Sequence, residues 1–209
     1  MESVTTSQGA FTAAASLLTI APGLDTALVL RTATTEGARR AALSGLGIAI
    51  GCFGSASAVG FGLGALLAAS EVAYSVMRGF GAAYLIWIGY KMLCHPRRVV
   101  LAEDHRTGGG RAAFAKGVLT NLLNPKVGIF YVSFLPQFVP NGVSVVSYIL
   151  LLGAIHATLG LLWFACLITA TQPLARFLGR PALVQTMDRL TGGLFLAFGV
   201  GLALESRRP

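Results

Sequence analysis

Long apolar runs separated by short charged segments recur along the whole chain. The hydrocarbon core of a bilayer is about 30 Å thick, so a helix that crosses it needs about 20 mainly apolar residues. Six runs are long enough, and we expect six membrane-spanning helices at roughly residues 10–31, 41–69, 71–92, 113–135, 145–170 and 183–204. The pattern therefore predicts an all-α integral membrane protein.

Composition agrees with this class. Of the 209 residues, 55% are hydrophobic and only 11% are charged, and the mean hydropathy is +0.72, which is untypical of a soluble globular domain. The net charge of +8 could suggest nucleic acid, but the basic residues lie mainly in loops between apolar runs. We expect the lipid bilayer, and no nucleic acid, among the partners of this chain.

The basic residues also predict an orientation. Those in the loops after the first, third and fifth spans are Arg31, Arg39, Arg40, Lys91, Arg97, Arg98, Arg106, Arg111, Lys116, Arg176, Arg180 and Arg189. The opposite side has only Arg78, Arg207 and Arg208. Because cytoplasmic loops are enriched in Lys and Arg, we expect these loops to be cytoplasmic and both termini to lie outside.

The spans divide into two halves of three helices. Residues 1–93 form the first half, 113–209 form the second, and the polar segment 94–112 reads as a cytoplasmic linker. Three helices per half is an odd number, so a second copy of the same unit must enter the membrane upside down. This predicts two inverted three-helix repeats in one transmembrane domain, an architecture common among secondary transporters.

Helix breakers and polar residues coincide at corresponding places in the two halves. They are Pro22, Gly23 and Asp25 in the first span, and Asn124, Pro125 and Lys126 in the fourth. Proline lacks an amide hydrogen and clashes with the preceding turn, so we expect both helices to be broken mid-membrane. Irregular backbone is tolerated there only where protein or a water-filled cavity surrounds it.

The charges at the breaks allow two interpretations. A charge near the bilayer centre is costly, so Asp25 and Lys126 should face the protein interior with partners. They could bind the ammonium and carboxylate of an amino acid together with open helix ends, or they could form a structural ion pair. Asn121 could line the same cavity or cap the half-helix, and His156 could relay protons or make an interhelical hydrogen bond.

Other features are less specific. The glycines of the second span, including Gly47, Gly51, Gly60 and Gly64, suit close helix packing within one protomer or at a homodimer interface. No Walker A motif, HExxH motif, nucleophile elbow or paired metal-ligand spacing of cysteines is found in the sequence. We expect neither an enzyme nor a bound cofactor or metal.

Several segments resemble the LysE/RhtB-type amino-acid exporter family. They are "APGLDTALVL", "EGARRAALSGLGIAIG", "GFGAAYLIWIGYKML", "KGVLTNLLNPKVGIFYVSFLPQFV" and "LTGGLFLAFGVGLAL", in this order along the chain. The Asn-Pro-Lys segment that ends in "FLPQF" is the most specific of them. The sequence departs from the family where Leu24 follows Pro22 and Gly23, since the family usually has Pro-Gly-Pro there.

The resemblance implies an exporter of amino acids or related small polar solutes in a bacterial inner membrane, commonly working by proton exchange. It also implies that Pro22, Gly23 and Asp25 form the family's first helix-break motif, and that Asn124, Pro125 and Lys126 form its second. Two alternatives stay open. One is a carrier of another solute, such as a metal cation, although the spans offer few oxygen or thiolate ligands. The other is a membrane scaffold that transports nothing.

Overall fold

The computed structural model describes residues 4–69, 71–96, 109–140, 142–170 and 180–204, and the regular structure in them is helical. The helices are α1 (Val4–Ile20), α2 (Leu24–Thr35), α3 (Ala38–Ala69), α4 (Glu71–Cys94), α5 (Gly110–Leu122), α6 (Pro125–Ile129), α7 (Val145–Thr169) and α9 (Pro181–Leu204). A π-helical turn, η1 (Phe130–Phe134), and a 3-10 turn, η2 (Leu135–Phe138), continue α6. Most of the expected linker, with Arg97, Arg98 and Arg106, and also Arg176, Arg207 and Arg208, lie outside the described residues.

The prediction of an all-helical fold is confirmed for these residues. Two helices are long and apolar enough to cross a membrane alone, over Ala38–Ala65 and Val145–Thr169. Two bent pairs qualify as well if each counts as one span, with bends of 50° between α1 and α2 and 56° between Gly110–Leu122 and Lys126–Phe138. Helices α4 and α9 coincide with the third and sixth expected spans but do not meet the same test over their described residues, so their crossing stays a prediction.

Both breaks lie where the prolines predict them. In an unbroken helix the amide of residue 22 would bond the carbonyl of Leu18, but Pro22 has no amide hydrogen, and α1 ends at Ile20. Pro125 is the first residue of α6, where a missing amide hydrogen costs nothing. The carbonyl of Asn121, which Pro125 leaves without its helical donor, accepts instead from the amide of Asn124 at 3.0 Å.

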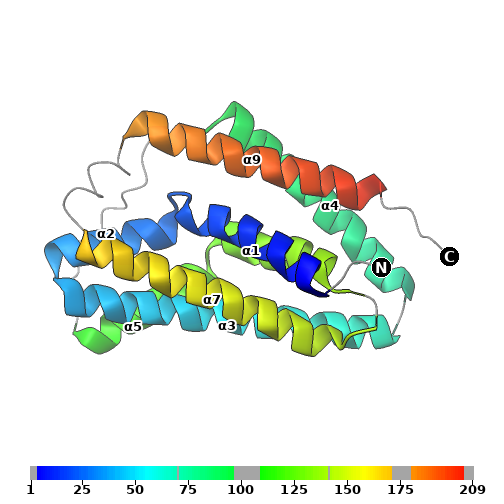
Figure 1. Ribbon diagram of the computed structural model, residues 1–209, viewed down its shortest axis with the longest axis horizontal. Coiled ribbons are helices and arrows are strands. Elements are labelled where there is room, and N and C mark those ends of the chain that lie inside the picture. The colour runs from blue at the N-terminus through cyan, green and yellow to red at the C-terminus, as the bar shows by residue number, and fades with distance from the viewer. Residues whose placement is uncertain (1–3, 70, 97–108, 141, 171–179, 205–209) are drawn as a thin grey trace.

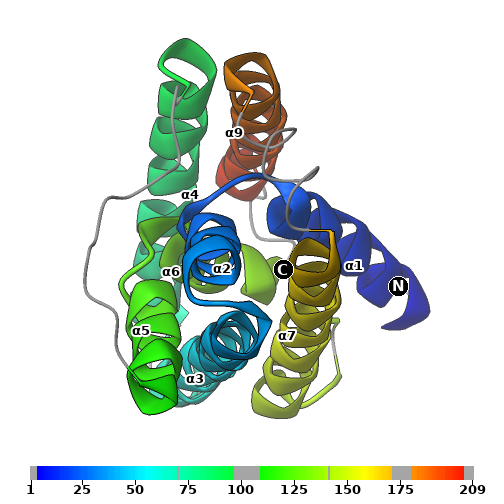
Figure 2. The same cartoon turned by 90° about the vertical axis from the view of Figure 1, so that its left-hand side faces the viewer.

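The helices form a bundle with a separate pair along one side (Figure 1). Helix α3 packs against α5 and α7, α2 lies on α3, and α1 runs along α7. Helices α4 and α9 pack mainly against each other and run in opposite directions, at the top of Figures 1 and 2. The short α6 and its continuation lie inside this assembly, where α1, α3, α4 and α7 surround them.

Glycines allow these helices to touch backbone to backbone. A Cβ placed on Gly47 of α3 would lie 2.1 Å from the Phe114 carbonyl oxygen, and one on Gly117 of α5 would lie 2.1 Å from the Ser44 carbonyl oxygen. Gly51, Gly60 and Gly64 are likewise in close contact with α5 or α7. The glycines of the second expected span therefore serve packing within the protomer, one of the two interpretations of their spacing.

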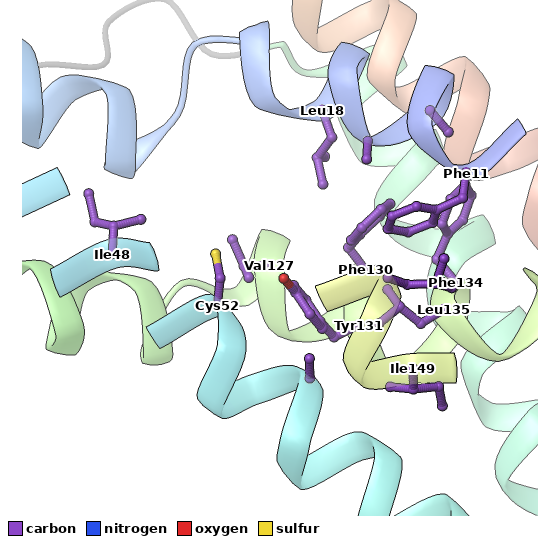
Figure 3. Close-up of a cluster of buried hydrophobic side chains, with 14 of the residues drawn as sticks. Phe11, Leu18, Ile48, Cys52, Val127, Phe130, Tyr131, Phe134, Leu135 and Ile149 are labelled. Atoms are coloured by element: carbon purple, nitrogen blue, oxygen red, sulfur yellow. The ribbon is translucent and has the colours of Figure 1, made fainter. Parts of the chain in front are cut away.

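An aromatic cluster fills the interior beside α6 (Figure 3). The rings of Phe130 and Phe134, one turn apart in η1, stack at a centroid distance of 4.6 Å. Phe11 of α1 meets Phe138 edge-on at 5.5 Å, and the Ser7 hydroxyl donates to the Phe138 carbonyl. These contacts tie the first half-helix of one break to the irregular continuation of the other.

Replacing a glycine at the α3–α5 crossing should destabilise the protein. Because the added methyl of Gly117→Ala would meet backbone rather than a movable side chain, we expect it to lower the free energy of unfolding by about 1 to 3 kcal/mol. Gly54→Ala is the matched control, since nothing lies within 4 Å of its Cβ position. The measurement is thermal denaturation in detergent, and equal midpoints for the two variants would contradict this packing.

Candidate functional site

The two helix breaks meet inside the bundle. The side-chain amide of Asn121, at the end of α5, donates to Asp25 Oδ2 at 2.9 Å, and Asp25 lies in the first turn of α2. The same Nδ2 lies 3.2 Å from Cys52 Sγ of α3. Asn121 and Cys52 are both buried. The hydrogen bond between Asn121 and Asp25 thus joins residues that are 96 positions apart in the sequence.

The second break is capped by its own asparagine. Asn124 Oδ1 accepts from the backbone amide of Lys126 at 3.1 Å, so Asn124 is the N-cap of α6. Of the two roles considered for Asn121, capping the half-helix is therefore wrong, and its side chain is directed to the first break instead. The first break has no such cap, because Gly23 precedes α2 and has no side chain to accept from its amides.

Lys126 reaches back to the first break. Its ammonium lies 3.5 Å from the carbonyl oxygen of Leu18, the carbonyl that Pro22 leaves without a helical donor. In Figure 3, Leu18 of α1 and Val127 of α6 lie on opposite sides of the region where the breaks meet. Each break therefore supplies the other with a hydrogen-bonding group: Asn121 to Asp25, and Lys126 to the backbone of α1.

A cavity of about 50 Å³ lies at this junction. Asp25 borders it from the first break, Asn124 and Lys126 border it from the second, and His156 of α7 is a further polar group of its wall. The rest of the lining is mainly apolar and includes Ile48, Val127, Ala157 and Phe164. A cavity of this volume with polar groups around it has room for a few water molecules or a small polar group.

One oxygen at the cavity lacks a donor. Asp25 Oδ1 is buried and has no hydrogen-bond partner among the described residues, while its Oδ2 accepts from Asn121. An orphaned carboxylate oxygen in the interior is unfavourable, and it is satisfied when a donor arrives. An ammonium group could donate to this oxygen, and protonation of the carboxyl group would remove the unpaired charge and turn the oxygen into a donor. Asp25 can therefore bind either a cationic donor or a proton at this oxygen.

The buried polar residues Tyr131, Cys52 and Asp188 were not identified as candidates from the sequence, whereas His156 was. Tyr131 of η1 and His156 of α7 join at 2.9 Å between the Tyr hydroxyl and His Nδ1, which is the interhelical bond considered for His156. Cys52 contacts Asn121, and Asp188 of α9 is 1% exposed. Within the described residues, no group of three or more His, Cys, Asp or Glu side chains could hold a metal ion. Only the position of Asp188 within an apolar span could have indicated its burial.

These features define a class: a helical membrane protein with two broken helices that meet at a small polar cavity. The family model of the LysE type translocator matches residues 16–206, and the chain belongs to that family. The resemblance seen in the sequence is thereby confirmed.

The chain is also similar over most of its length to known proteins. A membrane protein of Vibrio cholerae is 30% identical over 93% of this chain and 95% of its own. A homoserine/homoserine lactone efflux protein of Salmonella typhi is 28% identical, with 93% and 94% covered. A leucine efflux protein of Enterobacter sp. is 28% identical, with 89% and 90% covered. No solved structure matches the chain.

Removing the amide that joins the breaks should loosen this junction. In a background where the exposed Cys94 and Cys166 are replaced by alanine, we expect Asn121→Ala to speed maleimide labelling of Cys52, because its buried neighbour is gone. Loss of the bond to a carboxylate should also lower the free energy of unfolding by about 1.5 to 3 kcal/mol.

The matched control for this experiment is Gln137→Ala, which also removes a hydrogen-bonded side-chain amide, in this case one that donates to the Ser133 carbonyl. It should leave the labelling rate of Cys52 unchanged. Equal labelling rates in Asn121→Ala and the parent protein would show that the Asn121 contact does not protect the junction.

Proposed function

We propose that this protein is a secondary transporter that exports amino acids or closely related small polar solutes across the bacterial inner membrane in exchange for protons. The observation that carries the proposal is that Asp25 of one break and Asn124 and Lys126 of the other border the same cavity. The efflux relatives named above support the class of solute.

The chemistry of the cavity matches a zwitterion. In our proposal Asp25 binds the ammonium group through the oxygen that has no donor. Lys126, together with the uncapped amides at the start of α2 behind Gly23, binds the carboxylate. Asn121 and Asn124 position these charges through the two hydrogen bonds that they make. Pro22, Gly23 and Pro125 keep both helices open at this level.

Coupling to protons follows from competition for Asp25. Protonation of its carboxyl group removes the charge that attracts the ammonium, so proton and substrate exclude one another at a single site. A carrier that changes sides only when one of the two is bound exchanges them across the membrane. Solute leaves as protons enter down their gradient.

The proposed architecture is six spans in two inverted repeats, residues 1–93 and 113–209, that rock against each other. The antiparallel pairing of the third helix of each half, α4 with α9, supports such a relation. Contacts at the pair are reciprocal, because a Cβ on Gly89 would meet the Gly192 carbonyl and one on Gly192 would meet that of Gly89. A homodimer stays an untested prediction, because the glycines that suggested it pack against α5 and α7 of the same chain.

The proposed orientation places the basic helix ends in the cytoplasm. The end of α2 and the starts of α3, α5 and α9, which carry many of the basic residues, lie at one end of the bundle (left in Figure 1). The start of α1 and the end of α9 lie at the other end. This arrangement agrees with an even number of crossings and with both termini outside.

Neutralising either charge should slow transport strongly. The assay uses proteoliposomes loaded with an equimolar amino-acid mixture, with and without a pH gradient, and mass spectrometry identifies what leaves. We expect Asp25→Asn and Lys126→Met each to reduce gradient-driven efflux at least about tenfold, because each removes a charge-assisted contact to the substrate.

Matched controls neutralise charges remote from the cavity. Glu36→Gln removes a carboxylate that pairs with Arg40, and Lys91→Met removes an exposed ammonium over the Trp87 ring. Both should transport at the parent rate. The site would be refuted if Asp25→Asn and Lys126→Met both exported at the parent rate with full dependence on the pH gradient. The function would be refuted if liposomes containing the folded parent protein released no amino acid.

A further inference from the structure

His156 is a buried residue of the cavity wall to which the proposed binding of the zwitterion gives no role. It lies on α7 and is 6% exposed. Its Nδ1 is engaged by the Tyr131 hydroxyl at 2.9 Å, and its Nε2 makes no hydrogen bond to the described residues. Because His156 lines the polar cavity, this ring nitrogen offers a hydrogen-bonding position to a ligand group that enters the cavity.

The ring is held firmly in this position. Its centroid lies 5.4 Å from that of Phe130 and 5.6 Å from that of Tyr131, and both neighbours are fully buried. Tyr131 belongs to the π-helical turn η1, a type of irregularity that is frequent at functional sites. Figure 3 shows the Tyr131 hydroxyl pointing out of the aromatic cluster toward Cys52 and Val127, into the region where the breaks meet.

The remaining α7 residues in the cavity wall are Ala157, Gly160 and Phe164, which offer no side-chain hydrogen bond. His156 is thus the polar group on the side contributed by α7, while the charged groups come from the breaks on α2 and α6. A bound amino acid whose ammonium and carboxylate occupy the charged groups would direct its side chain to another part of the wall. Small residues at 157 and 160 leave room there for a short side chain.

We propose that His156, oriented by Tyr131, binds a hydroxyl group on the side chain of the exported solute, so that the preferred cargo is a small hydroxylated amino acid. This inference rests on the proposed function. In a neutral imidazole one nitrogen donates and the other accepts, and the Tyr131 contact uses Nδ1. A hydroxyl both donates and accepts, so it can pair with Nε2 in either tautomer, whereas an aliphatic side chain would leave this nitrogen without a partner.

The test compares two cargoes that differ only in this group. Homoserine and norvaline have side chains of equal length, with a terminal hydroxyl in one and a methyl in the other. Proteoliposomes containing the full chain are loaded with both, and their efflux rates are measured by mass spectrometry. The parent protein should export homoserine about tenfold faster, the discrimination expected from one hydrogen bond in a buried site.

Variants assign that preference to the pair. His156→Leu should bring the ratio of homoserine to norvaline efflux close to one while norvaline efflux continues. His156→Gln keeps a hydrogen-bonding side chain and should retain most of the preference for homoserine. Tyr131→Phe should lower the ratio part of the way, because the ring loses the contact that orients it. Tyr148→Phe is the matched control, since this α7 tyrosine bonds the Val4 carbonyl at 3.4 Å and does not border the cavity, and its ratio should be unchanged.

The outcomes separate this inference from the proposed function. Equal efflux of both amino acids from the parent protein, or an intact ratio in His156→Leu, overturns the role of His156 while leaving amino-acid export in place. An intact ratio with lost pH-gradient dependence would make His156 a proton relay, which also overturns it. If size-exclusion chromatography shows that His156→Leu is misfolded, Tyr131→Phe is compared with Tyr148→Phe instead. Equal ratios of homoserine to norvaline efflux in these two variants then overturn the inference. Absence of efflux of any amino acid from the folded parent refutes the proposed function itself.

Discussion

The structure depends on how two broken helices satisfy each other's exposed polar groups. Each proline removes a backbone donor in a place where lipid would offer no replacement. The breaks stabilise each other because they meet: Asn121 of the second break binds Asp25 of the first, and the Lys126 ammonium lies beside the Leu18 carbonyl that Pro22 leaves without a helical donor. Separating the two breaks would leave a carboxylate, an ammonium and a carbonyl without these partners.

Close backbone packing makes this meeting possible. Glycines at the α3–α5 crossing leave no space for a Cβ and so bring α5, with Asn121 at its end, against α3. Gly51 serves the same purpose one turn further along α3, since a Cβ there would lie 2.9 Å from the Asn121 side chain. On the other side of the cavity, the aromatic cluster around Phe130 fixes the continuation of α6 against α1. Packing thus determines where the polar groups can be.

The junction is held together but is incompletely satisfied, and this combination suits a carrier. The amide nitrogen of Asn121 and the side chain of Asn124 fix the geometry, while Asp25 Oδ1 and Asn121 Oδ1 are buried and have no hydrogen-bond partner among the described residues. A site with unfilled hydrogen-bonding capacity gains more from a ligand than a fully paired structural ion pair would. For this reason we propose a binding site rather than a purely structural role for the same charges.

Local patterns in the sequence determined much of this protein, because run length, proline and charge act through short-range rules. They were sufficient for the all-helical class, both helix breaks, the family, and the limits of most helices to within three residues, although α1 begins at Val4, six residues before the expected start of the first span. They were not sufficient for the bond of Asn121 to Asp25 or for the Tyr131–His156 pair. Those features depend on which residues meet across 25 to 96 positions of chain, and only the packing of the helices in three dimensions decided that.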